Sequence, residues 1–157
     1  MSGNVPQVII YTDGSALGNP GKGGYGIVMI SKNHRKELSQ GYRLTTNNRM
    51  ELLSVIVGLE SLKNPGTVVS IYSDSKYVVD AVEKKWLFGW EQKKFKKKKN
   101  VDLWKRFLNI YPKHKVSFIW VKGHAGNKEN EVCDELAVDA ANSRDLLVDE
   151  AYELGKD

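Results

Sequence analysis

The sequence has almost no cysteine, few prolines and no long hydrophobic run. A single cysteine, Cys133, among 157 residues cannot form a disulfide within the chain, which excludes a disulfide-framework protein and favours a reducing compartment. No apolar stretch approaches the ~18 residues that a membrane-spanning helix needs, and the polar residues 1–7 lack the pattern of a signal peptide. With 4 prolines and 14 glycines, the composition also excludes a collagen-like chain. We therefore expect a cytoplasmic globular protein.

The length of the chain and its uninterrupted patterning predict one domain over residues 1–157, with a core at about residues 8–142. There is no internal repeat and no linker long enough to separate two domains. From about residue 147 onward the chain is acidic and has no hydrophobic period, so we expect a loosely ordered tail there.

The net charge of +5 is small, but the charges are unevenly distributed along the chain. Residues 84–99 contain eight lysines and one acid, whereas residues 129–157 contain ten acids and two bases. A run of lysines can be a solvated face, but its concentration in one segment favours contact with a polyanion. We therefore expect this basic segment to contact a polyanion.

Hydrophobic periodicity predicts the order β-β-β-α-β-α-basic segment-α-β-α. Alternating or β-branched runs indicate strands at residues 8–11, 25–30, 37–44, 67–72 and 116–121. Apolar residues at helical spacing indicate helices at residues 49–62, 75–85, 101–111 and 129–142. Short connections between the first three strands and a helical crossover to the fourth predict an α/β fold. Its sheet is expected to be mixed and five-stranded, with three antiparallel and then two parallel strands, flanked by helices.

Four carboxylates are candidates for a shared site. Asp13 and Asp74 follow the first and fourth strands, whose carboxyl ends meet at one edge if the strands are parallel neighbours. Glu51 lies on the inward row of a helix, and Asp134 lies in the first turns of the last helix. Each has a simpler explanation alone: a turn for Asp13, a helix cap for Asp74, a basic partner for Glu51 and a surface helical acid for Asp134. Together they would repel one another unless cations lie between them, which favours Mg²⁺ or Mn²⁺.

The loop after the last predicted strand, Lys122–Gly126, contains His124 between two glycines, Gly123 and Gly126. An exposed loop histidine is the simpler interpretation. An imidazole that can move beside a metal site can also transfer protons.

Several motifs occur in order along the chain. They lie at residues 11–15, 18–26, 45–51, 73–75 and 120–126, followed by Asn130 and the segment Cys133–Ala137. Together they resemble type 1 ribonuclease H of the bacterial kind. The similarity runs over about residues 8–142, and the stretches Thr45–Glu51 and Val121–Gly126 are long enough to be specific.

The resemblance implies a ribonuclease H-like fold and an enzyme that hydrolyses the RNA strand of RNA/DNA hybrids to 5′-phosphate and 3′-hydroxyl ends, with little sequence preference. It implies four metal-binding, catalytic carboxylates and a mobile catalytic histidine, which are Asp13, Glu51, Asp74, Asp134 and His124. Two Mg²⁺ ions about 3.5–4 Å apart, for which Mn²⁺ can substitute, would then be the cofactors. In that arrangement Asp13 would bridge both ions, Glu51 and Asp74 would hold one, and Asp134 the other.

The resemblance also implies a set of residues that contact the nucleic acid. Those expected at the backbone, including a phosphate pocket for the DNA strand, are Asn19, Thr46, Asn47, Asn48 and Arg49. The resemblance further implies that residues 84–100 form the family's basic protrusion. The residues expected at the minor groove and on this protrusion are Lys76, Trp86, Trp90, Lys96, Lys97, Lys98 and Lys99. Two positions depart from the family pattern: Phe95 stands where a third tryptophan is expected, and Lys76 where a glutamine is expected.

Two other classes of function remain open on sequence grounds. A non-catalytic module that binds hybrids or duplex RNA would be expected to lack some of the four carboxylates, and all four are present. Another nuclease or strand-transfer enzyme on the same fold is disfavoured by the His124 loop and the lysine segment. The expectation is a monomeric endonuclease whose partner is an RNA/DNA hybrid, with no membrane association.

Overall fold

The computed structural model describes residues 7–122 and 127–157. The strands are β1 (Gln7–Ala16), β2 (Gly21–Ser31), β3 (His34–Thr45), β4 (Val68–Ser73), β5 (Lys115–Trp120) and β6 (Leu146–Leu147). The helices are α1 (Asn47–Glu60), α2 (Lys76–Glu83), α3 (Trp86–Gln92), α4 (Val101–Ile110), α5 (Lys128–Ala141) and α6 (Glu150–Glu153). A short 3₁₀ helix, Tyr111–Lys113, links α4 to β5. No helix in these described ranges is both long and apolar enough to cross a membrane.

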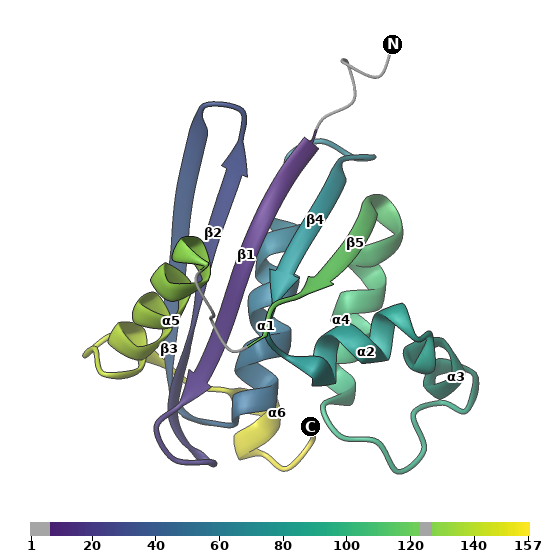
Figure 1. Cartoon of the computed structure of the whole chain (residues 1–157). Helices are drawn as coiled ribbons and strands as arrows, with labels where there is room; N and C mark the ends of the chain where they lie inside the picture. The colour runs from purple at the N-terminus through teal and green to yellow at the C-terminus, as the bar shows by residue number, and fades with distance from the viewer. Residues whose placement is uncertain (1–6, 123–126) are drawn as a thin grey trace.

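One mixed sheet with the strand order β5-β4-β1-β2-β3-β6 forms the centre of the molecule (Figure 1). β1, β2 and β3 pair antiparallel, and β1, β4 and β5 pair parallel. The predicted α/β fold with three antiparallel and then two parallel strands is therefore confirmed. The predicted number of five strands is wrong, because the two residues of β6 add a parallel edge to β3. A pairing of two residues is too short to produce a strand pattern in the sequence.

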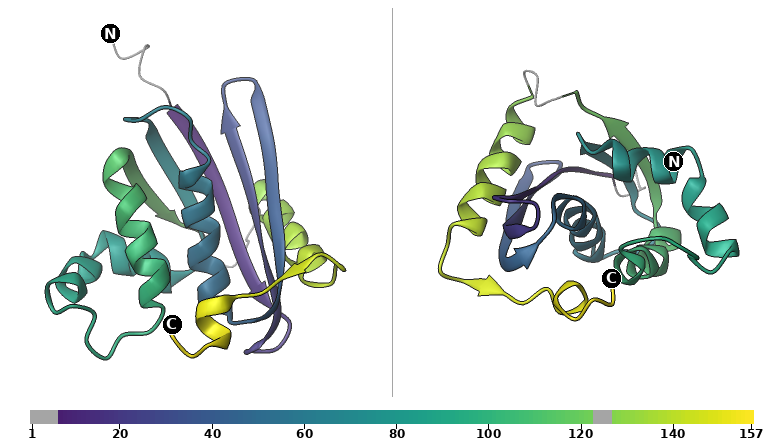
Figure 2. Two further views of the ribbon diagram at one scale, coloured as in Figure 1. Left: turned by 180° about the vertical axis from the view of Figure 1, so that it is seen from behind. Right: turned by 90° about the horizontal axis from the view of Figure 1, so that it is seen from below.

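Helices cover both faces of the sheet (Figures 1 and 2). On one face α1 packs against Ile10 and Ile27, which are fully buried, with Gly58 at the contact. The same layer contains α4, whose Trp104 and Phe107 are also fully buried, as the helical spacing predicts. This layer therefore contains most of the hydrophobic core.

α5 packs closely against the opposite face because the strands beneath it carry glycines. A Cβ atom on Gly24 would lie 2.6 Å from the carbonyl oxygen of Ala137. A Cβ on Gly26 or Gly41 would collide with the carbonyl oxygen of Cys133 or of Ala140, respectively. The glycines of β2 and β3 thus set the depth at which α5 lies on the sheet.

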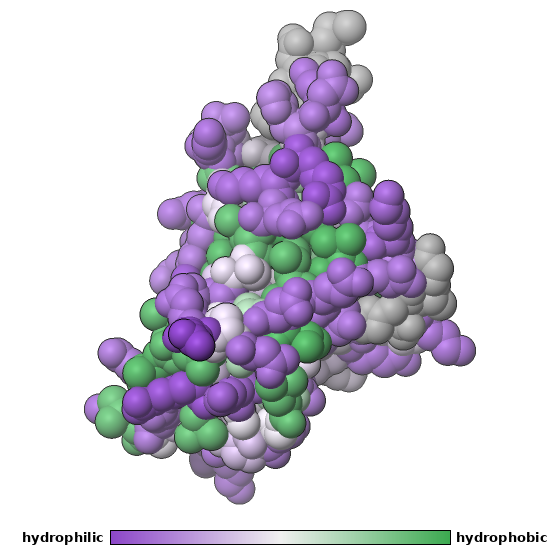
Figure 3. All heavy atoms as spheres, turned by 90° about the vertical axis from the view of Figure 1, so that its left-hand side faces the viewer, coloured by the Kyte–Doolittle hydropathy of each residue, from purple (hydrophilic) through white to green (hydrophobic). Residues whose placement is uncertain are grey.

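The outward face of α5 is acidic and exposed, with Glu131, Glu135 and Asp139 at helical spacing. Seen from that side, the surface is largely hydrophilic, with apolar groups between the polar ones (Figure 3). Only the inward stripe of α5, which includes Cys133 and Ala137, is fully buried.

The C-terminal segment, for which the sequence predicts a loose tail after residue 147, contains β6 and α6 in the structure. β6 pairs with β3, and α6 follows it against the start of α1 (Figure 2). Asp149 is buried and accepts hydrogen bonds from Arg49 and from Thr45. The segment is held by ion pairs rather than by an apolar stripe, so hydrophobic periodicity does not reveal its order.

The lysine-rich segment contains one helix, α3, followed by an irregular loop. Lys94, Phe95, Lys97 and Asn100 all have positive φ angles between 54° and 62°. Leu87 and Phe95 are buried and anchor the segment to the core, whereas the lysines at 96–99 are exposed.

Candidate active site

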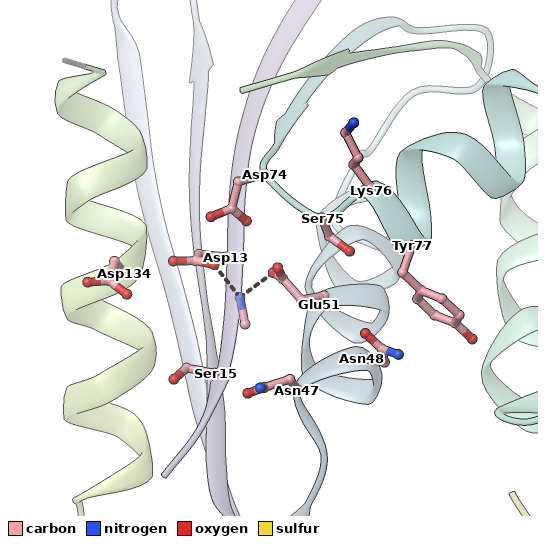
Figure 4. A pocket seen from close by; sticks show the side chains of 11 residues that line it. Asp13, Ser15, Asn47, Asn48, Glu51, Asp74, Ser75, Lys76, Tyr77 and Asp134 are labelled. Carbon is pink, nitrogen blue, oxygen red and sulfur yellow. Dashed lines mark hydrogen bonds between the residues drawn. The ribbon is translucent and has the colours of Figure 1, made fainter. Parts of the chain in front are cut away.

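Three carboxylates meet where β4 ends beside β1. Asp13 lies in β1, two residues past the last β1–β4 pair, Tyr11–Tyr72, and Asp74 directly follows β4. Glu51 comes from the first turns of α1 and points towards them (Figure 4). One oxygen from each carboxylate lies within 4.8 Å of the others, and in the described ranges this is the group of acids suited to a metal ion.

The local structure rules out the simpler roles of Asp13 and Asp74. Asp13 is not in a turn, because β1 continues to Ala16 and pairs Asp13 with Gly26 of β2. Asp74 does not cap α2; the cap is Ser75, whose hydroxyl accepts a hydrogen bond from Val78 N–H.

Gly14 joins two of the acids through its backbone. Its N–H lies 2.9 Å from Oδ1 of Asp13 and 2.6 Å from Oε1 of Glu51 (Figure 4). A Cβ at this position would collide with the backbone of Met50 and Glu51, so a glycine lets β1 approach the start of α1. Among the residues that the structure describes, the hydrogen-bond donor to the Glu51 carboxylate is therefore the backbone N–H of Gly14 and not a basic side chain.

Burial and mutual repulsion raise the proton affinity of the cluster. Asp13 is 3% exposed, and burial, followed by the charges of Asp74 and Asp134, raises its pKa to about 8. Burial, followed by the charge of Asp13, raises the pKa of Glu51 well above its ordinary value. A divalent cation would relieve the repulsion that protons otherwise relieve.

The three acids lie in a pocket of about 430 Å³. Its remaining lining residues are Gly14, Ser15, Asn47, Asn48, Ser75, Lys76, Tyr77 and Asp134. Asp134 lines the pocket from α5, on the other side of β1, and is not within the 4.8 Å group (Figure 4). The structure thus brings all four predicted carboxylates to one pocket. His124 lies outside the described residues.

A second pocket, of about 390 Å³, lies beside the first and shares Asn48 with it. Of the residues expected to contact nucleic acid, Asn19, Thr46, Asn48 and Lys99 line it. Sequence reasoning missed its other lining residues, which are Asn100, Tyr152 and Asp157. The last two belong to the segment that was expected to be loose.

Three of the residues expected to contact nucleic acid also make hydrogen bonds that hold the pocket wall in place. The Oδ1 atom of Asn47 accepts a hydrogen bond from Ala16 N–H at 2.6 Å, and Asn47 N–H donates to Oδ1 of Asn19 at 3.2 Å. Thr46 is the N-cap of α1 and accepts from Arg49 N–H. These contacts fix the β1–β2 turn against the start of α1.

The position of Arg49 differs from the expectation of a nucleic-acid contact. Its side chain is 2% exposed and makes bidentate hydrogen bonds to Asp102 and to Asp149, with distances of 2.7–2.8 Å. Its guanidinium donors point into the protein, where the buried Asp149 and the partly exposed Asp102, from distant parts of the chain, each accept two hydrogen bonds.

The remaining predicted residues lie on the basic side of the molecule. Trp86 is 50% exposed, whereas Trp90 packs edge-on against Trp104 at 5.8 Å. Lys98 lies over the Trp90 ring at 4.6 Å, and Lys76 lies over the Trp120 ring at 4.5 Å. The ammonium groups of this surface are therefore partly ordered by aromatic rings.

Substituting Asp13 should stabilise the metal-free protein at neutral and alkaline pH. The folded-state pKa of Asp13, about 8, exceeds the ordinary 3.8. The stability that the folded protein gains by holding a proton on Asp13 is therefore fully present below about pH 4 and is lost as the pH rises through 8. In EDTA, Asp13→Asn should raise the unfolding free energy at pH 8 by roughly 1–3 kcal/mol, and by much less at pH 4.5. Urea denaturation measures both. An Asp13→Asn protein that is less stable than wild type at pH 8 in EDTA would show that repulsion among the acids does not destabilise the metal-free fold.

The class of this protein follows from the chemistry of the first pocket and its surroundings. Acidic oxygens that suit hard divalent cations, set beside a lysine-rich surface, belong to a metal-dependent nuclease. The comparisons with known proteins identify the family. The RNase H family model matches residues 5–142, and the chain belongs to the ribonuclease H family, whose metal-dependent members hydrolyse the RNA strand of RNA/DNA hybrids.

Relatives support this over nearly the whole chain. It is 52% identical to a protein named Ribonuclease H from Rippkaea orientalis, over 98% of this chain and 96% of that protein. It is 54% identical to a Ribonuclease H from Syntrophus aciditrophicus, over 93% of this chain and 87% of that protein. Among solved structures, LC9-RNase H1, a type 1 RNase H with the type 2 active-site motif, is similar with a TM-score of 0.80. That similarity has 34% identity and covers 96% of this chain and 81% of that one.

Proposed function

We propose that the first pocket is the active site of an endonuclease that cuts the RNA strand of an RNA/DNA hybrid, leaving 5′-phosphate and 3′-hydroxyl ends. The observation that carries the proposal is the group of Asp13, Glu51 and Asp74, whose oxygens lie within 4.8 Å of one another. The raised pKa of Asp13, to about 8, supports the proposal, because a cation among these acids would relieve the repulsion that raises it.

The donor set fits Mg²⁺, with Mn²⁺ as a substitute, because all the donors are carboxylate oxygens. Asp13, Glu51 and Asp74 would hold the ions, together with Asp134 from α5. When bound, two such ions activate the attacking water and stabilise the departing 3′-oxygen. The role of His124 as the proton-transferring residue rests on the family resemblance.

The chain's own residues would orient the two strands. Asn48 lines both pockets, so its amide can serve the RNA strand at the first and the DNA strand at the second. An amide offers both donors and an acceptor, as recognition of a 2′-hydroxyl requires. Lys99 and Thr46, in the second pocket, are suited to a phosphate of the DNA strand. Contacts of this kind carry little sequence information.

The exposed lysines 96–98, with Trp86 and Lys76, would extend the contact along the hybrid backbone. The proposal includes action as a monomer in the cytoplasm. Light scattering with and without a hybrid would measure the stoichiometry.

Cleavage of a hybrid with a labelled RNA strand tests the function directly. With Mg²⁺ or Mn²⁺ we expect the RNA of the hybrid to be cut, and single strands, duplex RNA and duplex DNA to be spared. Binding of the hybrid without cleavage in either metal would support a non-catalytic module instead. Equal cutting of every substrate would contradict the proposed specificity.

Replacing the lysine run tests its contact with phosphates. Lys96, Lys97 and Lys98 are exposed, so their change to Ala should leave stability nearly unchanged and weaken hybrid binding. Each phosphate contact that is lost should reduce the slope of log affinity against log salt by roughly 0.9. Anisotropy titrations at several salt concentrations measure the slope, with Lys32→Ala, on the β2–β3 turn, as a control. An unchanged slope would show that these three lysines face solvent and do not contact the phosphates.

A further inference from the structure

We propose that the C-terminal segment, residues 146–157, is part of the nucleic-acid-binding surface, with Tyr152 contacting the sugar–phosphate backbone and with Arg49 and Asp149 as positioning residues. This rests on the proposed function. The segment forms one wall of the second pocket, and an ion cluster centred on the buried Arg49 joins this wall to the others.

The second pocket is built from four parts of the chain. Asn19 comes from the β1–β2 turn, Thr46 and Asn48 from the start of α1, and Lys99 and Asn100 from the loop before α4. Tyr152, in α6, supplies the fourth wall. A phenol offers a hydroxyl donor for a phosphate oxygen and an apolar ring face for a sugar. Tyr152 therefore adds an uncharged hydrogen-bond donor to the pocket.

Arg49 is the link between these walls. From α1 its guanidinium binds Asp149 next to α6 and Asp102 in the first turn of α4, all at 2.7–2.8 Å. Its Nη1 also donates to the Oδ1 atom of Asn100, a pocket residue, at 3.4 Å. A displacement of the C-terminal segment would therefore remove a restraint on the loop that carries Lys99 and Asn100.

Asn100 is a sensitive point in this linkage. It has a φ angle of 62° and immediately precedes α4. Its amide donates to the hydroxyl of Tyr77 at 3.0 Å, and Tyr77 lines the first pocket. The chain of contacts from Asp149 through Arg49 and Asn100 to Tyr77 thus connects the C-terminal segment with both pockets.

Part of the acidic charge of the segment is neutralised within the protein. Asp149 is paired with Arg49, and Glu153 makes a bidentate ion pair with Arg43 at 2.8–2.9 Å. Asp157 lines the second pocket and adds a negative charge there, which the cation Lys99 in the same lining offsets when a phosphate binds.

Substitutions of Tyr152 and of the ion cluster test the proposal. Tyr152→Ala should weaken binding of a fluorescein-labelled RNA/DNA hybrid, measured by anisotropy in EDTA, roughly tenfold, the order expected for a lost hydrogen bond to a charged group. Tyr152→Phe separates the hydroxyl from the ring. Asp149→Asn and Arg49→Lys should raise KM several-fold and change kcat less than twofold.

Arg106→Gln is the matched control, because Arg106 also joins α4 to α1, through a bidentate pair with Glu60 at 2.6–2.7 Å, but outside both pockets. It should leave KM unchanged. A purely structural role would lower the melting temperature of the Asp149 and Arg49 variants without moving KM. Unchanged or tighter hybrid binding by Tyr152→Ala would overturn the inference while wild type still cleaves the hybrid. Wild type that neither binds nor cleaves a hybrid would overturn the proposed function instead.

Discussion

Asp74→Asn should reduce hybrid cleavage by roughly 10³-fold or more, since a metal site contributes several kcal/mol to the transition state and each 1.36 kcal/mol is a factor of ten. The substitution keeps the size of the side chain and removes one of the three carboxylates of the cluster. The backbone oxygen of Asp74, which accepts from Trp120 Nε1 at 3.2 Å, is unaffected.

Hybrid binding should persist in Asp74→Asn, because the second pocket and the lysine surface are unchanged. Single-turnover cleavage at saturating enzyme, with anisotropy in EDTA, separates the two quantities. Asp139→Asn, an exposed acid on α5, is the matched control and should behave as wild type. Cleavage within tenfold of wild type would remove Asp74 from the catalytic centre.

Arg49→Ala should cost about 3–5 kcal/mol of unfolding free energy, the range seen when one partner of a buried ion pair is removed. The Asp149 carboxylate, 9% exposed, would keep its hydrogen bond from Thr45 and lose its counter-charge. For a chain of this size the loss corresponds to a melting temperature lower by roughly 10 °C.

Arg106→Ala provides the comparison for Arg49→Ala. Its pair with Glu60 is 46% and 34% exposed and should contribute about 1 kcal/mol or less. Urea denaturation at neutral pH measures both variants. Equal losses would show that burial of the Arg49 cluster adds no stability beyond that of a surface pair.

The sequence was sufficient for the layout of the sheet and for the meeting of the acids. Glu51 is recognisable because a charged residue heads the inward row of α1, and Asp74 because it ends a short buried strand. Asp13 lies beside the end of β4, as the sequence predicts. The expected reason was partly wrong, because β1 does not end at Asp13 but continues alongside β2 beyond the last β1–β4 pair. Strand length is set by the pairing partner, which lies elsewhere in the chain.

The roles of Arg49 and of the C-terminal segment could not be predicted from the sequence. Arg49 lies in a motif that suggests nucleic-acid contact, but its partners Asp102 and Asp149 are 53 and 100 residues away. Ion pairs over such distances leave no periodic signal, and an acidic segment without apolar spacing resembles a disordered one. Tyr152 was missed for the same reason.

The glycines beneath α5 have a consequence for how the enzyme tolerates change. Because Asp134 is on α5, the position of one of the four acids proposed to hold the metal ions depends on the depth at which that helix rests on Gly24, Gly26 and Gly41. Even an alanine at these positions would lift the helix, and with it Asp134, away from Asp13. In a library of random variants, these glycines should therefore score as activity determinants, although none of them faces the substrate.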